Sequence, residues 1–140
     1  MVIYITKEEV FNINRNLGLI YGQEHFLQQE ANLDHVLDRM QHYAENIMDG
    51  DERILKKAAH FLYHVAYTAH AFSDGNKRTA LTATLHFLLL NNYVLKPSMF
   101  TREKQEELAK FMKDTAEGKN SLSAVHSWLK ERLMKFEIYG

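Results

Sequence analysis

The chain has 140 residues, of which 46% are hydrophobic and 25% are charged, a composition typical of a globular domain with its own core. Its 17 basic and 18 acidic side chains give a net charge of −1, which argues against a dedicated nucleic-acid-binding protein. The absence of cysteine excludes disulfides and thiolate metal sites and favours a reducing compartment.

The sequence shows no targeting or membrane signal. Its first residues lack the charged segment and long apolar run of a signal peptide. The most apolar run, residues 81–90, contains Thr82, Thr84 and His86, and it is too short and too polar to span a bilayer. We therefore expect one cytoplasmic domain over residues 1–140, with no membrane contact.

The N-terminal third predicts two helices separated by an irregular segment. Residues 6–9, Thr-Lys-Glu-Glu, form a capping box that opens a helix ending near Gly18. Residues 21–31 have no clean helical face and predict a loop or a short hairpin. Asn32 is then expected to cap a second helix, whose apolar residues recur at three- and four-residue spacing until about residues 49–50.

The remainder of the chain predicts four more helices, at residues 51–70, 76–90, 101–116 and 121–133. The second of these is apolar on nearly every face, which indicates a helix surrounded by others. A short extended piece is expected at residues 93–96. The predicted fold is therefore all-α: a single bundle of about six helices.

The stretch HAFSDGNKRTA, residues 70–80, does not have the composition of a core segment. It connects the end of one predicted helix to the start of the next, where unpaired N–H groups and the helix dipole attract anions. Gly75 allows close approach of a ligand to the backbone. Lys77 and Arg78 oppose the dipole there, which makes sense if a phosphate lies between them.

Other side chains of the stretch complete a chemical set. Asp74 suits Mg²⁺, which is commonly held by one carboxylate together with phosphate oxygens. Asn76 can either cap the helix or coordinate the metal through its amide oxygen. His70 fits a general base that takes a proton from a hydroxyl. Phe72 is expected to point into the core and anchor the connector. The set suits transfer of a phosphorus-containing group to an alcohol.

Each residue also has a purely structural explanation. His70 could be structural, Asp-Gly-Asn is a common turn sequence, and Lys77 and Arg78 could simply be solvated. Their joint occurrence within nine residues favours a site. A weaker alternative is a helical metallohydrolase that uses His60 and His64, which are four residues apart, together with Asp74.

The stretch resembles the active-site motif of the Fic/Doc superfamily, H-x-F-x-[D/E]-G-N-G-R-x-x-R. Residues that match in register are His70, Phe72, Asp74, Gly75, Asn76 and Arg78. Lys77 replaces the second glycine and Leu81 replaces the second arginine, and both departures are similar to the Doc (death-on-curing) branch. The resemblance extends weakly over nearly the whole chain.

The resemblance implies an all-α bundle with a short β-hairpin flap that docks an extended target segment by strand addition. It places the flap in residues 21–31. The implied docking residues are Tyr21, Gly22, Gln23, Glu24, His25 and Phe26.

The resemblance also implies chemistry. By position, His70 is the base, Asp74 and Asn76 serve Mg²⁺ and positioning, and Gly75, Asn76, Lys77 and Arg78 bind the nucleotide phosphates. The Doc-like departures favour transfer of the γ-phosphate of ATP to a protein hydroxyl. AMP transfer of the Fic type is the alternative, and a silent nucleotide-binding module is another.

The resemblance further implies partners. The target is a protein, with the translation machinery as one candidate, and no direct nucleic-acid binding is expected. The sequence has no match to the [S/T]-x-x-x-E-[G/N] inhibitory helix of many Fic proteins. Restraint would then come from a separate small antitoxin chain, as in Doc toxins.

Overall fold

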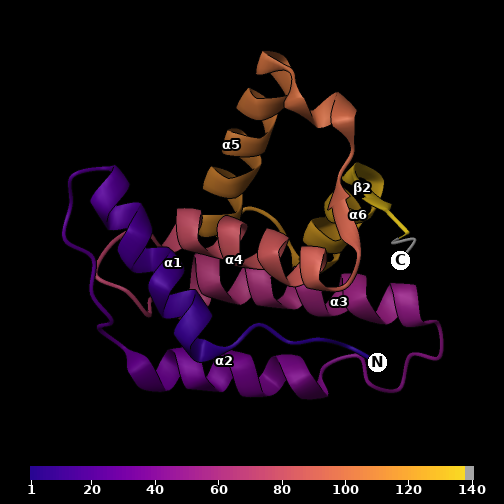
Figure 1. The fold of residues 1–140 in the computed structure, drawn as a ribbon, viewed down its shortest axis with the longest axis horizontal. Helices are drawn as coiled ribbons and strands as arrows, with labels where there is room; N and C mark the ends of the chain where they lie inside the picture. Colours follow the sequence, from indigo (N-terminus) through magenta and orange to yellow (C-terminus); the bar gives the residue numbers. More distant parts are fainter. Residues whose placement is uncertain (138–140) are drawn as a thin grey trace.

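The computed structural model describes residues 1–137, and they form the predicted all-α bundle (Figure 1). The α-helices of these residues are α1 (Lys7–Ile20), α2 (Glu30–His42), α3 (Gly50–Tyr63), α4 (Asn76–Leu90), α5 (Arg102–Ala116) and α6 (Leu122–Arg132). The shorter elements are the π-helical turn η1 (His64–Thr68), the 3₁₀ turn η2 (Pro97–Phe100), and the strands β1 (Tyr93–Leu95) and β2 (Leu133–Lys135). None of the described helices is long and apolar enough to cross a membrane.

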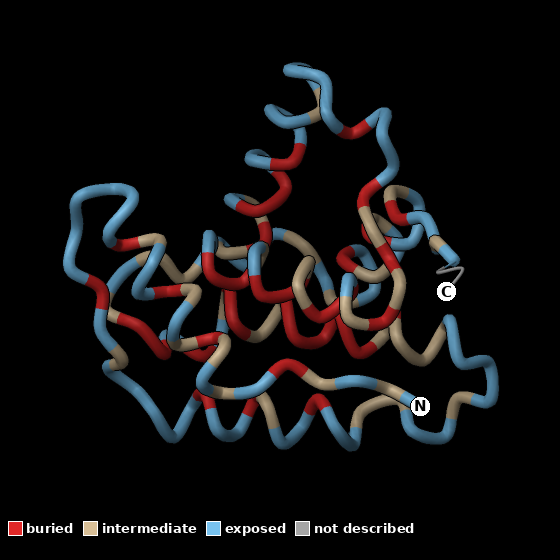
Figure 2. The backbone as a smooth tube through the Cα atoms, viewed as in Figure 1, coloured by how far each residue is buried: buried red, intermediate tan, exposed pale blue. Residues whose placement is uncertain are grey.

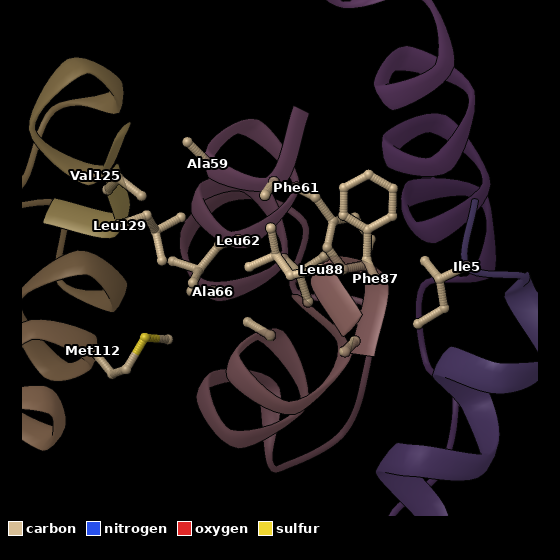
Figure 3. Close-up of a cluster of buried hydrophobic side chains, with 14 of the residues drawn as sticks. Ile5, Ala59, Phe61, Leu62, Ala66, Phe87, Leu88, Met112, Val125 and Leu129 are labelled. Atoms are coloured by element: carbon tan, nitrogen blue, oxygen red, sulfur yellow. The ribbon is translucent and has the colours of Figure 1, made fainter. Parts of the chain in front are cut away.

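The core lies around α3 and α4, which run side by side through the middle of the molecule (Figures 1 and 2). Phe61 of α3 and Phe87 of α4 are completely buried. Leu129 of α6 covers one side of this layer and Ile5 of the N-terminal segment covers the other (Figure 3). Burial of each large apolar side chain contributes about 1.5–3 kcal/mol, so the two helix ends that flank the connector are firmly fixed.

The start of α1 confirms the predicted capping box. The Thr6 hydroxyl accepts a hydrogen bond from the Glu9 N–H at 3.1 Å, and the Glu9 carboxylate accepts one from the Thr6 N–H at 2.9 Å. The Thr6 N–H, and then His86, lower the pKa of Glu9. The helix continues to Ile20, slightly past the predicted end at Gly18.

The predicted bounds of the second helix are wrong at both ends. Gln29 is the N-cap, and Asn32 lies inside the first turn, where its side chain donates to the Ala69 carbonyl at 2.7 Å. A tertiary partner has therefore replaced the local capping role. The helix ends at His42, and Ala44 has a left-handed φ of 63° that helical geometry does not allow.

The short sheet lies far from the predicted flap. Strands β1 and β2 pair antiparallel with Tyr93 opposite Lys135, which confirms the extended piece near residues 93–96. Residues 21–29 form a loop, one of the two predicted alternatives, and the β-hairpin flap that the resemblance placed there does not form among them. The loop is instead tied to the connector: the Gln28 N–H donates to the Ala71 carbonyl at 2.7 Å, and the Ser73 N–H donates to the Phe26 carbonyl at 2.9 Å.

Candidate active site

The connector between α3 and α4 begins with an unusual backbone. The π-helical turn η1 widens the helix end, and the Ala69 N–H closes it by donating to the His64 carbonyl at 2.9 Å. His70 follows with a left-handed φ of 46°, and its side chain is exposed. Strain of about 1–3 kcal/mol at such a residue must be held by its surroundings, and it concentrates at functional sites.

The connector ends at Gly75, the N-cap of α4. Its φ of 75° is the left-handed conformation that favours glycine. No side chain caps the helix, and Asp74 instead accepts a hydrogen bond from the Gly75 N–H at 2.7 Å. The amide groups of the first turn of α4 are therefore available to an anion.

Asn76 holds the connector in shape. Its amide oxygen accepts from the Phe72 N–H at 3.1 Å, and its amide nitrogen donates to the Phe72 carbonyl at 3.0 Å. The Phe72 side chain is only 2% exposed and belongs to the core. The Phe72 backbone thus engages both polar atoms of the Asn76 amide, and the roles of Asn76 toward Mg²⁺ and phosphate remain predictions.

An open groove of about 460 Å³ runs along the connector. It is lined by Ala66, His70, Ser73, Asp74, Gly75, Asn76, Lys77, Arg78, Lys113, Ala116 and Glu117. The structure thus brings together all the predicted site residues except the buried Phe72 and the residues of the predicted flap.

The groove is cationic. Its lysines and arginine, Lys77, Arg78 and Lys113, are exposed, and none of them pairs with a carboxylate within residues 1–137. Glu117 at the rim is engaged by Lys119 at 3.2 Å. Lys113 comes from α5, and no sequence signal identified it. Three cations without a carboxylate partner, beside a helix N-terminus, form a surface suited to phosphate.

His25 does not have the predicted flap role. Its side chain is buried beneath the connector, and its Nδ1 donates to the Asn14 carbonyl at 3.1 Å. A Cβ added to Gly75 would lie 2.6 Å from His25 Cε1. Gly75 is therefore required both by its backbone conformation and by the imidazole packed against it.

Asn14 is a second supporting residue that the sequence reasoning missed. It is 1% exposed, and its amide nitrogen donates to the Asp74 carbonyl and to the Thr79 hydroxyl, each at 3.0 Å. It thereby joins α1 to both sides of the Gly75 turn. A signal was present, because Asn14 lies between Val10 and Gly18 at four-residue spacing, on the face of α1 that is buried.

The remaining flap residues lie on the surface. Tyr21, Gly22, Gln23, Glu24 and Phe26 are all exposed, and target docking by them remains a prediction. Tyr21 has a further contact: the Arg78 guanidinium stacks on its ring at 3.9 Å from the centroid. The loop thus helps to orient one of the groove cations.

Asp74 is placed to hold a metal ion. Its carboxylate is 61% exposed at the groove, Oδ1 accepts from the Gly75 N–H, and Oδ2 lies 3.9 Å from His25 Nε2. One open carboxylate beside a phosphate surface fits Mg²⁺, which keeps most of its waters.

The metallohydrolase alternative is wrong. Asp74 lines the groove, whereas His60 and His64 line a separate pocket. No group of three or more His, Cys, Asp or Glu side chains in residues 1–137 is arranged to hold a metal ion.

Comparison with protein families agrees with this geometry. The model of the Fic/DOC family matches residues 4–88, more than half of the chain, and this range includes the whole connector. The chain belongs to the Fic/DOC family. No curated protein matches it.

Membership in the Fic/DOC family indicates a Fic-type enzyme. Enzymes of this family generally transfer nucleotide-derived groups to proteins, and they generally use a nucleoside triphosphate with Mg²⁺. The matched range ends within α4, so the wall that carries Lys113 lies outside it.

Proposed function

We propose that this Fic/DOC protein is a Doc-like ATP-dependent protein phosphotransferase, which moves the γ-phosphate of ATP to a hydroxyl side chain of a target protein. The observation that carries the proposal is the groove itself. It combines an uncapped start of α4, the unpaired cations Lys77, Arg78 and Lys113, and the exposed His70 within one volume of about 460 Å³.

Two positions favour phosphoryl transfer over AMP transfer. Lys77 places a long cationic side chain at the rim, where the general Fic motif has a glycine and a ligand can approach the backbone closely. Leu81, where the motif has a second arginine, is partly buried and packs against the core. Cations therefore lie at the opening of the groove and not one turn further along α4. This placement supports a binding orientation of the triphosphate that differs from the one that leads to AMP transfer.

The reaction needs few groups from the protein. The oxygen of the target hydroxyl bonds to the γ-phosphorus while the bond from that phosphorus to the β–γ bridging oxygen breaks, and ADP leaves. His70 accepts the hydroxyl proton. Lys77, Arg78 and the amides at the start of α4 stabilise the negative charge of the phosphates.

Mg²⁺ would be held by the carboxylate of Asp74, with Asn76 as a shared ligand. When bound, the ion would neutralise part of the negative charge of the phosphates. The other task of Asp74, accepting the Gly75 N–H, keeps the turn in the shape that exposes the α4 amides.

We further propose that the activity is that of a toxin restrained by a small antitoxin chain. The support is the Doc-like motif and the lack of an inhibitory [S/T]-x-x-x-E-[G/N] motif in this sequence. Expression of the chain alone should arrest growth, and a short neighbouring reading frame should relieve the arrest. Harmless expression of an active protein would contradict this role.

ATP labelled at either the γ- or the α-phosphate distinguishes the chemistries. The protein is incubated with each ATP and with cell lysate, and labelled proteins are separated. We expect label only from the γ position. Label only from the α position would show AMP transfer, and nucleotide binding without any labelled protein would show a silent module.

A further inference from the structure

A second pocket lies on the other side of the segment that carries His70. It has a volume of about 300 Å³ and is lined by Asn32, His35, Val36, Arg39, His60, His64, Thr68 and Ala69. It shares no lining residue with the active-site groove. Within residues 64–70, Ala66 and His70 face the groove, whereas His64, Thr68 and Ala69 face this pocket. We call it the histidine pocket.

The ionisable side chains of the histidine pocket are all basic. His35 and Arg39 come from α2, His60 comes from α3, and His64 starts η1. No Asp or Glu lines the pocket, and within residues 1–137 Arg39 forms no ion pair with a carboxylate. A basic cavity without an acid is complementary to an anion.

His60 has an unused polar atom. The residue is 5% exposed, and its Nδ1 is buried without a hydrogen-bond partner. Tyr43 stacks on the imidazole with a centroid distance of 4.3 Å, and His64 packs against it at 4.3 Å, so the ring is held in place. An unpartnered buried nitrogen costs free energy unless a ligand or water satisfies it.

His64 also has a free nitrogen. Nδ1 of His64 lies 2.7 Å from the Thr68 hydroxyl oxygen, which also lies 3.3 Å from the His64 carbonyl. Nε2 of His64 forms no hydrogen bond within residues 1–137. An oxyanion beside Nε2 would favour its protonation.

We propose that the histidine pocket binds a small oxyanion, a phosphate or carboxylate group, between Arg39 and the imidazoles of His60 and His64. The guanidinium supplies paired donors, and the imidazoles take up protons from solvent as the anion enters. A transition metal is disfavoured because the positive Arg39 faces the same space and no described trio of side chains is arranged to hold one.

The charges around the imidazoles make binding depend on pH. Burial, together with the positive charges of His64, Arg39, Lys57 and His35, lowers the pKa of His60 to about 4. Burial, Arg39 and His35 likewise lower the pKa of His64. An anion opposes these effects, so the pKa of each histidine should rise on binding, and binding should strengthen as the pH falls from about 7.5 to about 5.5.

The test follows the imidazole signals of the intact protein by NMR during pH titrations, with inorganic phosphate, acetate or matched sodium chloride. We expect phosphate or acetate to raise the titration midpoints of His60 and His64, and chloride to leave them unchanged. A larger shift with phosphate would show that the pocket selects phosphate groups. A larger shift with acetate would show that it selects carboxylate groups. Equal midpoints under all three salts would overturn the proposal.

Variants separate the histidine pocket from the active-site groove. Arg39→Gln, an exposed substitution on α2, should abolish the shift of both midpoints, whereas Arg78→Gln in the groove should preserve it. A shift retained in Arg39→Gln would overturn the proposal, and a shift lost only in Arg78→Gln would overturn it by assigning the ion to the groove. A shift produced by zinc and not by either anion would overturn it in favour of a metal site.

Discussion

The imidazole of His25 lies directly against Gly75, close enough that a Cβ on Gly75 would be 2.6 Å from His25 Cε1 and 2.9 Å from Nδ1. The loop after α1 thus sets the position of the turn at the start of α4. The shape of the connector therefore depends on its packing against His25 as well as on its own sequence.

Replacement of Gly75 by alanine should therefore have two costs. A left-handed backbone costs a non-glycine residue about 1–2 kcal/mol, and the clash with His25 adds about 1–3 kcal/mol. Urea unfolding measures the total, and ATP affinity should fall with it.

Gly22→Ala is the matched control for this substitution. Gly22 has a similar φ of 66° but nothing within 4 Å of an added Cβ, so only the backbone cost applies. Equal losses in the two variants would show that contact with His25 does not constrain Gly75.

The Asn14 side chain should contribute both to the stability of the protein and to its transfer activity. Asn14→Ala leaves the Thr79 hydroxyl and the Asp74 carbonyl without their donor, which predicts a loss of about 1–3 kcal/mol in unfolding free energy. Transfer activity should fall further, because the turn at Asp74 loses its tie to α1. Asn12→Ala, on the exposed face of the same helix, should change stability by at most about 0.5 kcal/mol. Equal unfolding free energies and equal transfer activities in the two variants would show that the hydrogen bonds of Asn14 to Asp74 and Thr79 have no role.

The stack of Arg78 on Tyr21 should help to hold the nucleotide. An exposed cation–π contact is worth about 0.5–1 kcal/mol, so Tyr21→Ala should weaken ATP binding about twofold to fivefold. Tyr21→Phe keeps the ring and should bind ATP like the wild type. Isothermal titration calorimetry measures both, and an equal loss in the two variants would instead implicate the hydroxyl group.

Buried His60 should make the free protein sensitive to acid. Its folded pKa of about 4 lies below the ordinary value of 6.5, so between these values the unfolded chain binds a proton that the folded protein does not. The contribution of His60 to the free energy of unfolding is therefore fully present above pH 6.5 and is lost as the pH falls towards 4. Below pH 4 this contribution changes no further. The loss is at most about 3 kcal/mol.

His60→Gln removes the titrating group and should flatten this part of the stability curve in urea unfolding experiments. His42→Gln, an exposed substitution on α2, should leave the curve as it is in the wild type. Parallel curves for the wild type and His60→Gln would show that the buried imidazole does not couple folding to pH.

Local signals predicted most of the fold. The capping box at Thr6, the cap at Thr101 and the cap at Ser121 all involve partners within three residues, so the sequence near each is sufficient to predict the helix start. The apolar character of residues 76–90 correctly indicated the helix at the centre of the bundle. These features depend on short-range hydrogen bonds and on periodicity.

Long-range contacts explain the errors. Asn32 looks like a cap, but its side chain bonds to Ala69, 37 positions away. The loop of residues 21–29 bonds to the connector instead of to itself, and this pairing cannot be read from either segment alone. Lys113 and His25 enter the site region by the same kind of tertiary packing, so the motif predicted the connector and not the residues that surround it.

The central claim is tested most directly by measuring transfer of the γ-phosphate of ATP to lysate proteins by the wild type and by His70→Ala side by side, with ATP affinity measured for both. The exposed imidazole is predicted to accept the proton and not to hold the nucleotide, so the variant should bind ATP like the wild type and transfer no phosphate. Transfer by His70→Ala at the wild-type rate would contradict the account.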